Sequence, residues 1–481
     1  MFAAVDAQVF IVTIALIGAV IMVGALLSGV AERTGLPRVA VLLAMGAALG
    51  PWGLGLVTLE LSDPFFRAVA ILSLVLVLFT DAVSVSVAEI RRNGRLAFLI
   101  VGPGTLVSAA LIAVAGWGLL GLAPGSAAML GAALASTDPV LVHELLRRRD
   151  VPPTARLALR LESGLNDGTL LPIVLVTMAI MVPPPQTGAA VAWGRLAFDL
   201  AVLGPGAGVL VGFLGVALLD LVRRRVGMRR EYESLYAFGV ALTAFAAAEA
   251  MHGSGFLAAF AAGLTIAAVD AELCDCFLDY GQATAEMFLL FTFVALGSGP
   301  IWGGFAVLDL RVLGFMVGAL LVRPAVLRLA IGRAGLDPES RRLIVWFGPR
   351  GLSSLLLILL PVFAGVPGAE RLFAICSFVV LVSLLVYGSA QMLGAWRGRP
   401  TGPAPASPPD DRVEERITFA ELTRLEQAGE PVVLLDVRKQ ADWDESDVKA
   451  RGAARVPPDA ARERAAELAL PRNAWLVAYC A

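Results

Sequence analysis

The segment Ser126-Ala-Ala-Met-Leu-Gly-Ala-Ala-Leu-Ala-Ser-Thr-Asp-Pro-Val-Leu-Val142 is apolar enough for a membrane helix, yet it contains Asp138 followed by Pro139. Proline lacks a backbone N–H and clashes with the carbonyl four residues earlier, so it breaks or kinks a helix. At membrane depth, freed carbonyls and helix ends are tolerated only where they line a cavity or an ion site. The segment therefore predicts a broken membrane helix with a carboxylate at the break.

The composition of the whole chain is that of a polytopic membrane protein. Its 481 residues are 58% hydrophobic and only 16% charged, with a mean hydropathy of +0.79. Soluble proteins carry about 25% charged residues, so a solely cytosolic enzyme is excluded, as are a collagen and a disordered chain. The net charge of −2, without a basic stripe, gives no sign of a nucleic-acid partner.

A spanning helix needs about 20 mainly apolar residues, and thirteen runs of the chain qualify. They lie near 9–31, 38–57, 65–88, 96–122, 126–147, 157–182, 194–222, 234–251, 254–270, 283–301, 309–331, 341–363 and 370–394. Arginines gather after the odd-numbered runs, so the positive-inside rule places the N-terminus outside and the C-terminus in the cytoplasm. We therefore predict an all-α, multi-pass protein of about thirteen transmembrane helices in the plasma (inner) membrane, in contact with the lipid bilayer.

Six of the charged residues inside these runs are candidates for function, because a charge within a span is costly and usually marks a transport pathway or proton relay. They are Asp81, Asp138, Glu162, Asp167, Glu286 and Arg350. Runs five and twelve both break, the latter at Gly348-Pro-Arg-Gly351, and they are seven apart, which predicts an inverted repeat whose two broken, crossing helices meet at the midplane. Asp138 and Arg350 would then neutralise the ends of the opposed half-helices. The alternative is a set of proline kinks with snorkelling charges.

The sixth run carries the chemistry expected of an ion site. Ser163 and Asp167 are four residues apart, as are Glu162 and Asn166, so each pair lies along one helix face. A hydroxyl, a carboxylate and freed carbonyls form a hard-oxygen site that suits an alkali cation better than a soft metal. A proton and a cation would exclude each other on Asp167, and this competition is sufficient for antiport if the site opens to the two sides in turn.

At these residues the sequence resembles the monovalent cation:proton antiporters, specifically the sodium/proton exchanger (NhaP-like) branch. The resemblance covers residues 9–394. It rests on five motifs in the family's order: Phe79-Thr-Asp-Ala82, Ser136-Thr-Asp-Pro139, Glu162-Ser-Gly-Leu-Asn-Asp-Gly168, Gly253-Ser-Gly-Phe-Leu-Ala-Ala-Phe260 and Gly348-Pro-Arg-Gly351. The family fold that it implies is a homodimer with a mobile core domain of six helices.

The resemblance also implies roles for the site residues. Asp167 would alternate between proton and cation. The other cation ligands would be Ser163, the backbone carbonyl of Thr137, Asp138 directly or through water, and Asp81, whose shorter reach than the glutamate of some relatives suggests a bridging water. A bracing network would consist of Glu162, Asn166 and Arg350. The Asn166-Asp167 pair, where other members have two aspartates, implies electroneutral exchange of one cation for one proton.

The C-terminal part of the chain differs in composition. We predict a membrane domain over 1–396, a Pro-rich linker over 397–411 and a small soluble α/β module over 412–481. Apolar strands at Pro431-Val-Val-Leu-Leu-Asp-Val-Arg438 and Ala474-Trp-Leu-Val-Ala-Tyr-Cys480 make this module similar to a rhodanese domain, in which the cysteine carries a persulfide. Because the chain stops one residue after Cys480, the module is interpreted as incomplete, and sulfur transfer is not expected.

These observations predict a secondary transporter, not an enzyme, that exchanges Na⁺, or Li⁺, for H⁺ by alternating access. It would need no cofactor and no metal beyond the transported cation. A K⁺/H⁺ antiporter of the same fold is the first alternative. A membrane-anchored sulfur-transfer or sensor protein is the alternative from another class, but an anchor does not need Asp138, Asp167 and Arg350 inside its spans.

Overall fold

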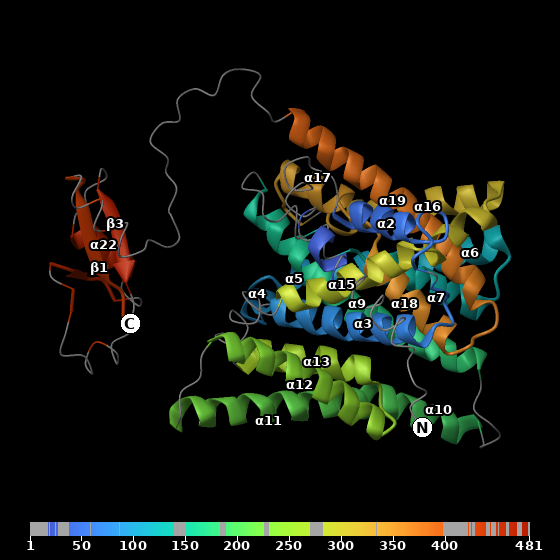
Figure 1. Ribbon diagram of the computed structural model, residues 1–481, viewed down its shortest axis with the longest axis horizontal. Coiled ribbons are helices and arrows are strands. Elements are labelled where there is room, and N and C mark those ends of the chain that lie inside the picture. The colour runs from blue at the N-terminus through green and yellow to red at the C-terminus, as the bar shows by residue number, and fades with distance from the viewer. Residues whose placement is uncertain are drawn as a thin grey trace. The chain divides into compact units, whose positions relative to one another are not determined.

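The computed structural model describes the chain from residue 18 to residue 479 apart from gaps, of which the longest are 27–37, 139–150 (save Val142), 270–281 and 398–421. The chain divides into two compact units, Met1–Arg399 and Pro400–Ala481. The first is helical and the second contains a small sheet (Figure 1). Each unit is described by itself.

The first unit is built of helices joined mostly by short connections. They are α2 (Arg38–Leu49), α3 (Pro64–Ser84), α4 (Val87–Arg92), α5 (Gly94–Leu99), the π-helix η1 (Ile100–Val107), α6 (Ser108–Leu120), α7 (Pro124–Ala135), α9 (Pro153–Met181), α10 (Ala189–Phe198), the π-helix η2 (Asp199–Leu203), α11 (Gly204–Arg225), α12 (Arg230–Ala250), α13 (Gly255–Val269), α15 (Gln282–Gly297), the 3-10 helix η4 (Pro300–Val307), α16 (Leu310–Ala330), α17 (Pro338–Trp346), α18 (Leu352–Phe363) and α19 (Ala369–Arg397).

Six stretches of this unit are long and apolar enough to cross a membrane, which confirms a helical, multi-pass membrane protein. They are Pro64–Ser84, Gly94–Leu120, Pro153–Met181, Trp193–Arg225, Leu310–Ala330 and Ala369–Ser389. A seventh span arises if Met287–Gly297 and Pro300–Val307, which meet at 46°, are one bent helix. The predicted thirteen complete spans are therefore not all present as long helices among the described residues. The reason is that several predicted spans, including those of α7 and α18, are built of shorter apolar helices.

Most predicted boundaries agree with the structure to within a few residues. The predicted division between runs eight and nine is confirmed, because α12 ends at Ala250 and α13 begins at Gly255. His252 lies in this turn with a φ of 64°, a left-handed backbone conformation that stops a helix. Capping fixes other helix ends: the Asp63 side chain accepts a hydrogen bond from the Phe65 N–H at the start of α3.

The described residues include both predicted break points. In the first, α7 ends at Ala135 and residues 136–138 are not helical; Pro139 lies outside the described residues. In the second, α17 ends at Trp346, residues 347–351 are unwound and α18 begins at Leu352. The Asp138 N–H donates to the Pro349 carbonyl at 2.9 Å. The two unwound segments therefore meet through their backbones.

The largest buried apolar cluster surrounds these breaks. It includes most of α7 and α18 and the inward faces of α3, α9, α16 and α19. A second cluster joins α11, α12 and α13 to α3, and Figure 1 shows these three helices lying along one side of α3. The unwound backbone is thus enclosed by protein, which is the condition under which irregular backbone is stable at membrane depth.

The second unit contains a three-stranded parallel sheet in the order β2-β1-β3. Its elements are β1 (Val432–Asp436), β2 (Ala454–Arg455), the helix α22 (Ala461–Glu467) and β3 (Trp475–Tyr479). Both predicted strands are confirmed, and Val432 pairs with Trp475 in register. Cys480 lies outside the described residues. The persulfide role considered for it stays a prediction.

Candidate functional site

Asp167 is the centre of the buried polar cluster at the breaks. Its side chain lies on α9 and is 1% exposed. The Ser136 hydroxyl, at the end of α7, donates a hydrogen bond to Asp167 Oδ1 at 2.5 Å. Asp167 Oδ2 has no hydrogen-bond partner. One carboxylate oxygen is therefore held in place while the other is free to bind a proton or a cation.

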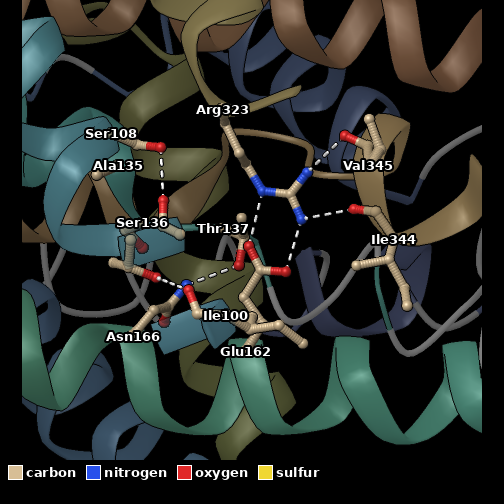
Figure 2. A network of polar contacts seen from close by, with 12 residues as sticks. Ile100, Ser108, Ala135, Ser136, Thr137, Glu162, Asn166, Arg323, Ile344 and Val345 are labelled. Carbon is tan, nitrogen blue, oxygen red and sulfur yellow. Dashed lines mark hydrogen bonds and ion pairs between the residues drawn. The ribbon is translucent and has the colours of Figure 1, made fainter. Parts of the chain in front are cut away.

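The neighbouring residues of α9 face the same break. The Asn166 amide nitrogen donates to the Thr137 hydroxyl at 2.6 Å, as Figure 2 shows. Ser163 is 3% exposed and its hydroxyl has no hydrogen-bond partner. The expected spacing of Ser163 and Asp167 on one face of a helix is thus realised. Together with the non-helical backbone at Thr137, these residues supply the hard oxygens that an alkali cation prefers.

Asp81 and Asp138 bring two further carboxylates close to Asp167. Both are buried, on α3 and in the first break respectively. Asp81 lies close enough to Asp167 and Asp138 for their charges to interact, and α3 approaches α9 tightly at Gly164, where a Cβ would meet the Asp81 carbonyl at 3.0 Å. Three buried carboxylates in one region repel one another strongly unless a proton or a cation is bound.

These carboxylates do not form a compact metal centre. Among the described residues, no group of three or more His, Cys, Asp or Glu side chains could hold a metal ion. Hydroxyl and main-chain oxygens are therefore needed to complete a cation site here. Such a mixed set of carboxylate and neutral oxygens is of the hard type that suits an alkali cation.

Arg350 lies at the C-terminal end of the first half-helix. The residue is 1% exposed, and its guanidinium donates to the carbonyls of Ala135 and Ser136 at 2.8 and 3.1 Å. The Arg350 N–H donates to the Ser383 hydroxyl of α19 at 2.7 Å. A cation at the carboxyl end of a helix satisfies free carbonyls and the helix dipole. The predicted neutralisation of this half-helix end by Arg350 is confirmed.

Asp138 occupies the complementary position at the second break. Its carboxylate contacts Gly351, the residue that precedes the first turn of α18, at the place where a Cβ would lie. A carboxylate at a helix N-terminus is stabilised by the free N–H groups and the dipole. Each of the two helix ends therefore faces a side chain whose charge is opposite to the partial charge of that end, as the sequence predicted.

Arg323 is a site residue that the sequence prediction missed. It lies on α16, and its Nε and Nη2 donate to the two carboxylate oxygens of Glu162 at 2.7 and 2.6 Å. The same guanidinium donates to the carbonyls of Ile344 and Val345, at the end of α17, at 3.2 Å each. Figure 2 shows the guanidinium between the carboxylate and these carbonyls. Arg323 therefore stabilises the end of α17 as Arg350 stabilises the end of α7.

The three residues of the predicted bracing network, Glu162, Asn166 and Arg350, make separate contacts in the structure. Glu162 pairs with Arg323, Asn166 with Thr137, and Arg350 with the carbonyls of α7. The signal for Arg323 was present in the sequence, because it is a charge inside the apolar run 309–331. Such a charge is expected to face protein and to be paired. The side chain of Glu286 lies outside the described residues.

The unwound segments, the buried carboxylates and the arginines at the helix ends are together typical of a secondary transporter. Residues 18–391 match the family model "Sodium/hydrogen exchanger, transmembrane". The chain belongs to this family, which confirms the family resemblance of its membrane part. The family is one of transporters and not of enzymes.

Relatives and solved structures agree with this assignment. The chain is 26% identical to the K(+)/H(+) antiporter NhaP of Alkalimonas amylolytica and 28% identical to the K(+)/H(+) antiporter NhaP2 of Shewanella sp. (strain ANA-3), each match covering 78% of this chain and 65% of the relative. The chain therefore spans just under two thirds of the length of these relatives. It is 30% identical to the uncharacterized Na(+)/H(+) exchanger Mb2309 of Mycobacterium bovis, over 80% of this chain and 74% of the relative.

The fold is also that of a solved antiporter structure. The sodium proton antiporter MjNhaP1 from Methanocaldococcus jannaschii, at pH 8, superposes with a TM-score of 0.64 over 80% of this chain and 99% of that chain, at 19% identity. At this identity the likeness shows the fold alone. The family match ends at residue 391. The rhodanese-like interpretation of the C-terminal unit therefore stays a prediction.

Proposed function

We propose that the membrane unit exchanges a monovalent alkali cation for a proton by alternating access, with Asp167 as the carboxylate that the two share. The observation that carries the proposal is the pair of Asp167 oxygens: Oδ1 accepts from Ser136 and the buried Oδ2 has no partner. A proton on Oδ2 removes the negative charge that attracts a cation. A cation bound at Oδ2 disfavours protonation of the same carboxylate, so the proton and the cation compete for it.

The arginines and amides around Asp167 support an exchange of one cation for one proton. Glu162 is neutralised by Arg323 and is therefore not available to carry a proton in the cycle. Asn166 brings no charge and is engaged with Thr137. Asp167 is then the one carboxylate of this helix that changes partner. Exchange would accordingly be electroneutral, with Asp81 and Asp138 serving as cation ligands beside it.

We further propose K⁺ as the preferred cation. The relatives from Alkalimonas amylolytica and Shewanella sp. (strain ANA-3), at 26% and 28% identity over 78% of this chain, are named for K⁺. Na⁺ is the alternative, because Mb2309 and MjNhaP1 carry names that refer to sodium. Homodimer formation and a cytoplasmic C-terminal unit accompany the proposal as predictions.

The test is transport in proteoliposomes that contain a pH-sensitive dye. A proton gradient is imposed, and K⁺, Na⁺ and Li⁺ are added in separate runs to the wild type, to Asp167→Asn and to Asp220→Asn. Asp220 lies in an exposed ion pair with Arg224 and serves as the matched control. We expect pH recovery that is greatest with K⁺, is lost in Asp167→Asn and is unchanged in Asp220→Asn. Recovery of equal size in Asp167→Asn would refute the assigned role, and its absence in the wild type would refute antiport.

A further inference from the structure

Asp167 lies between hydroxyls contributed by both broken helices. Ser136, at the end of α7, donates to one of its oxygens. Ser353, in the first turn of α18, lies beside the same carboxylate from the other broken helix. The sequence motifs drew attention to α7 and α9 but not to Ser353, which follows Gly348-Pro-Arg-Gly351 by two positions.

The Ser353 hydroxyl is buried beside the Asp167 carboxylate. The residue is 1% exposed, and its Oγ has no hydrogen-bond partner of ordinary geometry. Helix capping does not account for it, because α18 has no side-chain cap hydrogen bond. The adjacent Ser354, by contrast, donates to the Ser136 carbonyl at 3.4 Å. A buried hydroxyl without a partner is costly and requires an explanation.

The unpartnered atoms of this region are all oxygens. Asp167 Oδ2 and Ser163 Oγ come from α9, and Ser353 Oγ comes from α18. Arg350 and Arg323 are both engaged elsewhere, with the ends of α7 and α17. Each serine hydroxyl can turn its O–H toward the carboxylate and still offer a lone pair, so together with Asp167 Oδ2 these groups supply hard oxygens of the kind that an alkali cation prefers.

We propose that Ser353 is a further ligand of the transported cation and helps to determine which alkali cation the site prefers. This inference rests on the proposed function. A hydroxyl is a neutral, hard oxygen, so it contributes to coordination without adding charge. A larger cation takes more oxygen ligands than a smaller one. Loss of the Ser353 hydroxyl should therefore weaken K⁺ binding more than Na⁺ or Li⁺ binding.

The hydroxyl also has a partner in the proton-loaded state. When Asp167 Oδ2 carries a proton, the resulting O–H can donate to a Ser353 lone pair. When the proton leaves, the same lone pair can turn to the incoming cation. Ser353 would thus serve both halves of the exchange from α18, while Ser136 holds the opposite carboxylate oxygen from α7.

The experiment compares Ser353→Ala, Ser353→Thr and Ser108→Ala with the wild type. Ser108 is also 1% exposed, but its hydroxyl donates within its own helical segment to the Gly104 carbonyl, so it controls for loss of a buried serine. Two quantities are measured: the increase in melting temperature of the purified protein on addition of K⁺, Na⁺ or Li⁺, and the KM for each cation in exchange.

We expect Ser353→Ala to raise the KM for K⁺ about tenfold, as for loss of one ligand worth about 1.4 kcal/mol, with a smaller increase for Na⁺ and Li⁺. The maximal rate should stay within about twofold of the wild-type rate, because loss of a ligand weakens cation binding and not the exchange step itself. Stabilisation by K⁺ should be lost in Ser353→Ala, partly kept in Ser353→Thr and unchanged in Ser108→Ala.

Equal KM ratios and equal cation stabilisation in Ser353→Ala and the wild type would overturn the inference. A fall in maximal rate alone, identical for the three cations, would also overturn it, because that result indicates a structural role. If no alkali cation stabilises the wild type, Ser353 has no cation to bind and the inference is wrong. If cations stabilise the protein but drive no proton movement, only the proposed function fails, and Ser353 is judged on the stabilisation data.

Discussion

Arg323 and Glu162 are 161 residues apart in sequence and form a two-point ion pair, with N–O distances of 2.7 and 2.6 Å, inside the membrane unit. Both side chains are at least 95% buried. Because Arg323 also donates to the carbonyls of Ile344 and Val345, one guanidinium joins α9, α16 and the end of α17. The pair therefore holds the second broken helix against the helix that carries Asp167.

The first prediction concerns the removal of Arg323. Arg323→Leu leaves the Glu162 carboxylate buried without its partner, and breaking one side of a buried ion pair costs about 3–5 kcal/mol. We expect a large drop in the melting temperature of the purified protein. The double variant Arg323→Leu/Glu162→Leu should recover a substantial part of the loss, because no uncompensated charge is left. Arg224→Leu, in an exposed pair with Asp220, is the control and should change little. A double variant as unstable as Arg323→Leu would contradict this account.

The second prediction concerns the geometry of Arg350. Arg350→Lys keeps the positive charge but replaces a planar group that reaches both the Ala135 and Ser136 carbonyls with a single ammonium. We expect slower cation/proton exchange together with a lower melting temperature. Arg371→Lys, at an exposed position of α19, should leave both unchanged. Wild-type exchange and stability in Arg350→Lys would show that charge alone suffices at the end of α7.

The sequence predicted the local features of this molecule well. Apolar run lengths located most of the helices, and the proline-containing motifs located both breaks, because both signals depend on neighbouring residues. Strands β1 and β3 were likewise evident from short apolar runs. The connections within the site were not predictable in the same way. Glu162 pairs with Arg323, a residue 161 positions away, and no local sequence pattern marks such a partner.

The third prediction concerns the C-terminal unit at low pH. Hydrogen bonds from Arg438 hold the pKa of the buried Asp436 carboxyl well below its usual range, and the Tyr479 hydroxyl, which donates to it at 2.7 Å, adds to the effect. Since the folded-state pKa is depressed, the stabilisation is fully present above the unfolded value of about 3.9 and is lost as the pH falls through the folded value. We expect the protection of the β1 amides in the full chain, corrected for the intrinsic exchange rate, to stay constant between about pH 5 and 8, because Asp436 remains ionised over that range.

Asp436→Asn supplies the comparison for this prediction. It removes the charge that pairs with Arg438 at 2.7 Å and with Arg455 at 3.7 Å. Amide exchange in β1 should be faster than in the wild type at pH 7, and the difference should shrink as the wild-type carboxyl becomes protonated in strong acid. Glu467→Gln, in an exposed pair with Arg464, should behave as wild type. Identical β1 exchange in Asp436→Asn and the wild type at pH 7 would remove Asp436 from the stability of this sheet.

The last prediction concerns Gly351, which precedes α18 and contacts the Asp138 carboxylate. A Cβ at this position would occupy the space of that carboxylate, so Gly351→Ala forces Asp138, the unwound backbone or both to move. Inserting a methyl group into a filled interior costs about 1–3 kcal/mol, and here the displaced group is a proposed cation ligand. We expect a lower melting temperature and a marked increase in the KM for the cation.

Gly318→Ala is the matched control, since a Cβ there meets nothing within 4 Å and an alanine inside α16 favours the helix. It should preserve exchange and leave stability unchanged or slightly increased. Gly351→Ala with a wild-type KM would mean that Asp138 can leave this contact without affecting the cation, and the carboxylate would then be needed only to stabilise the start of α18.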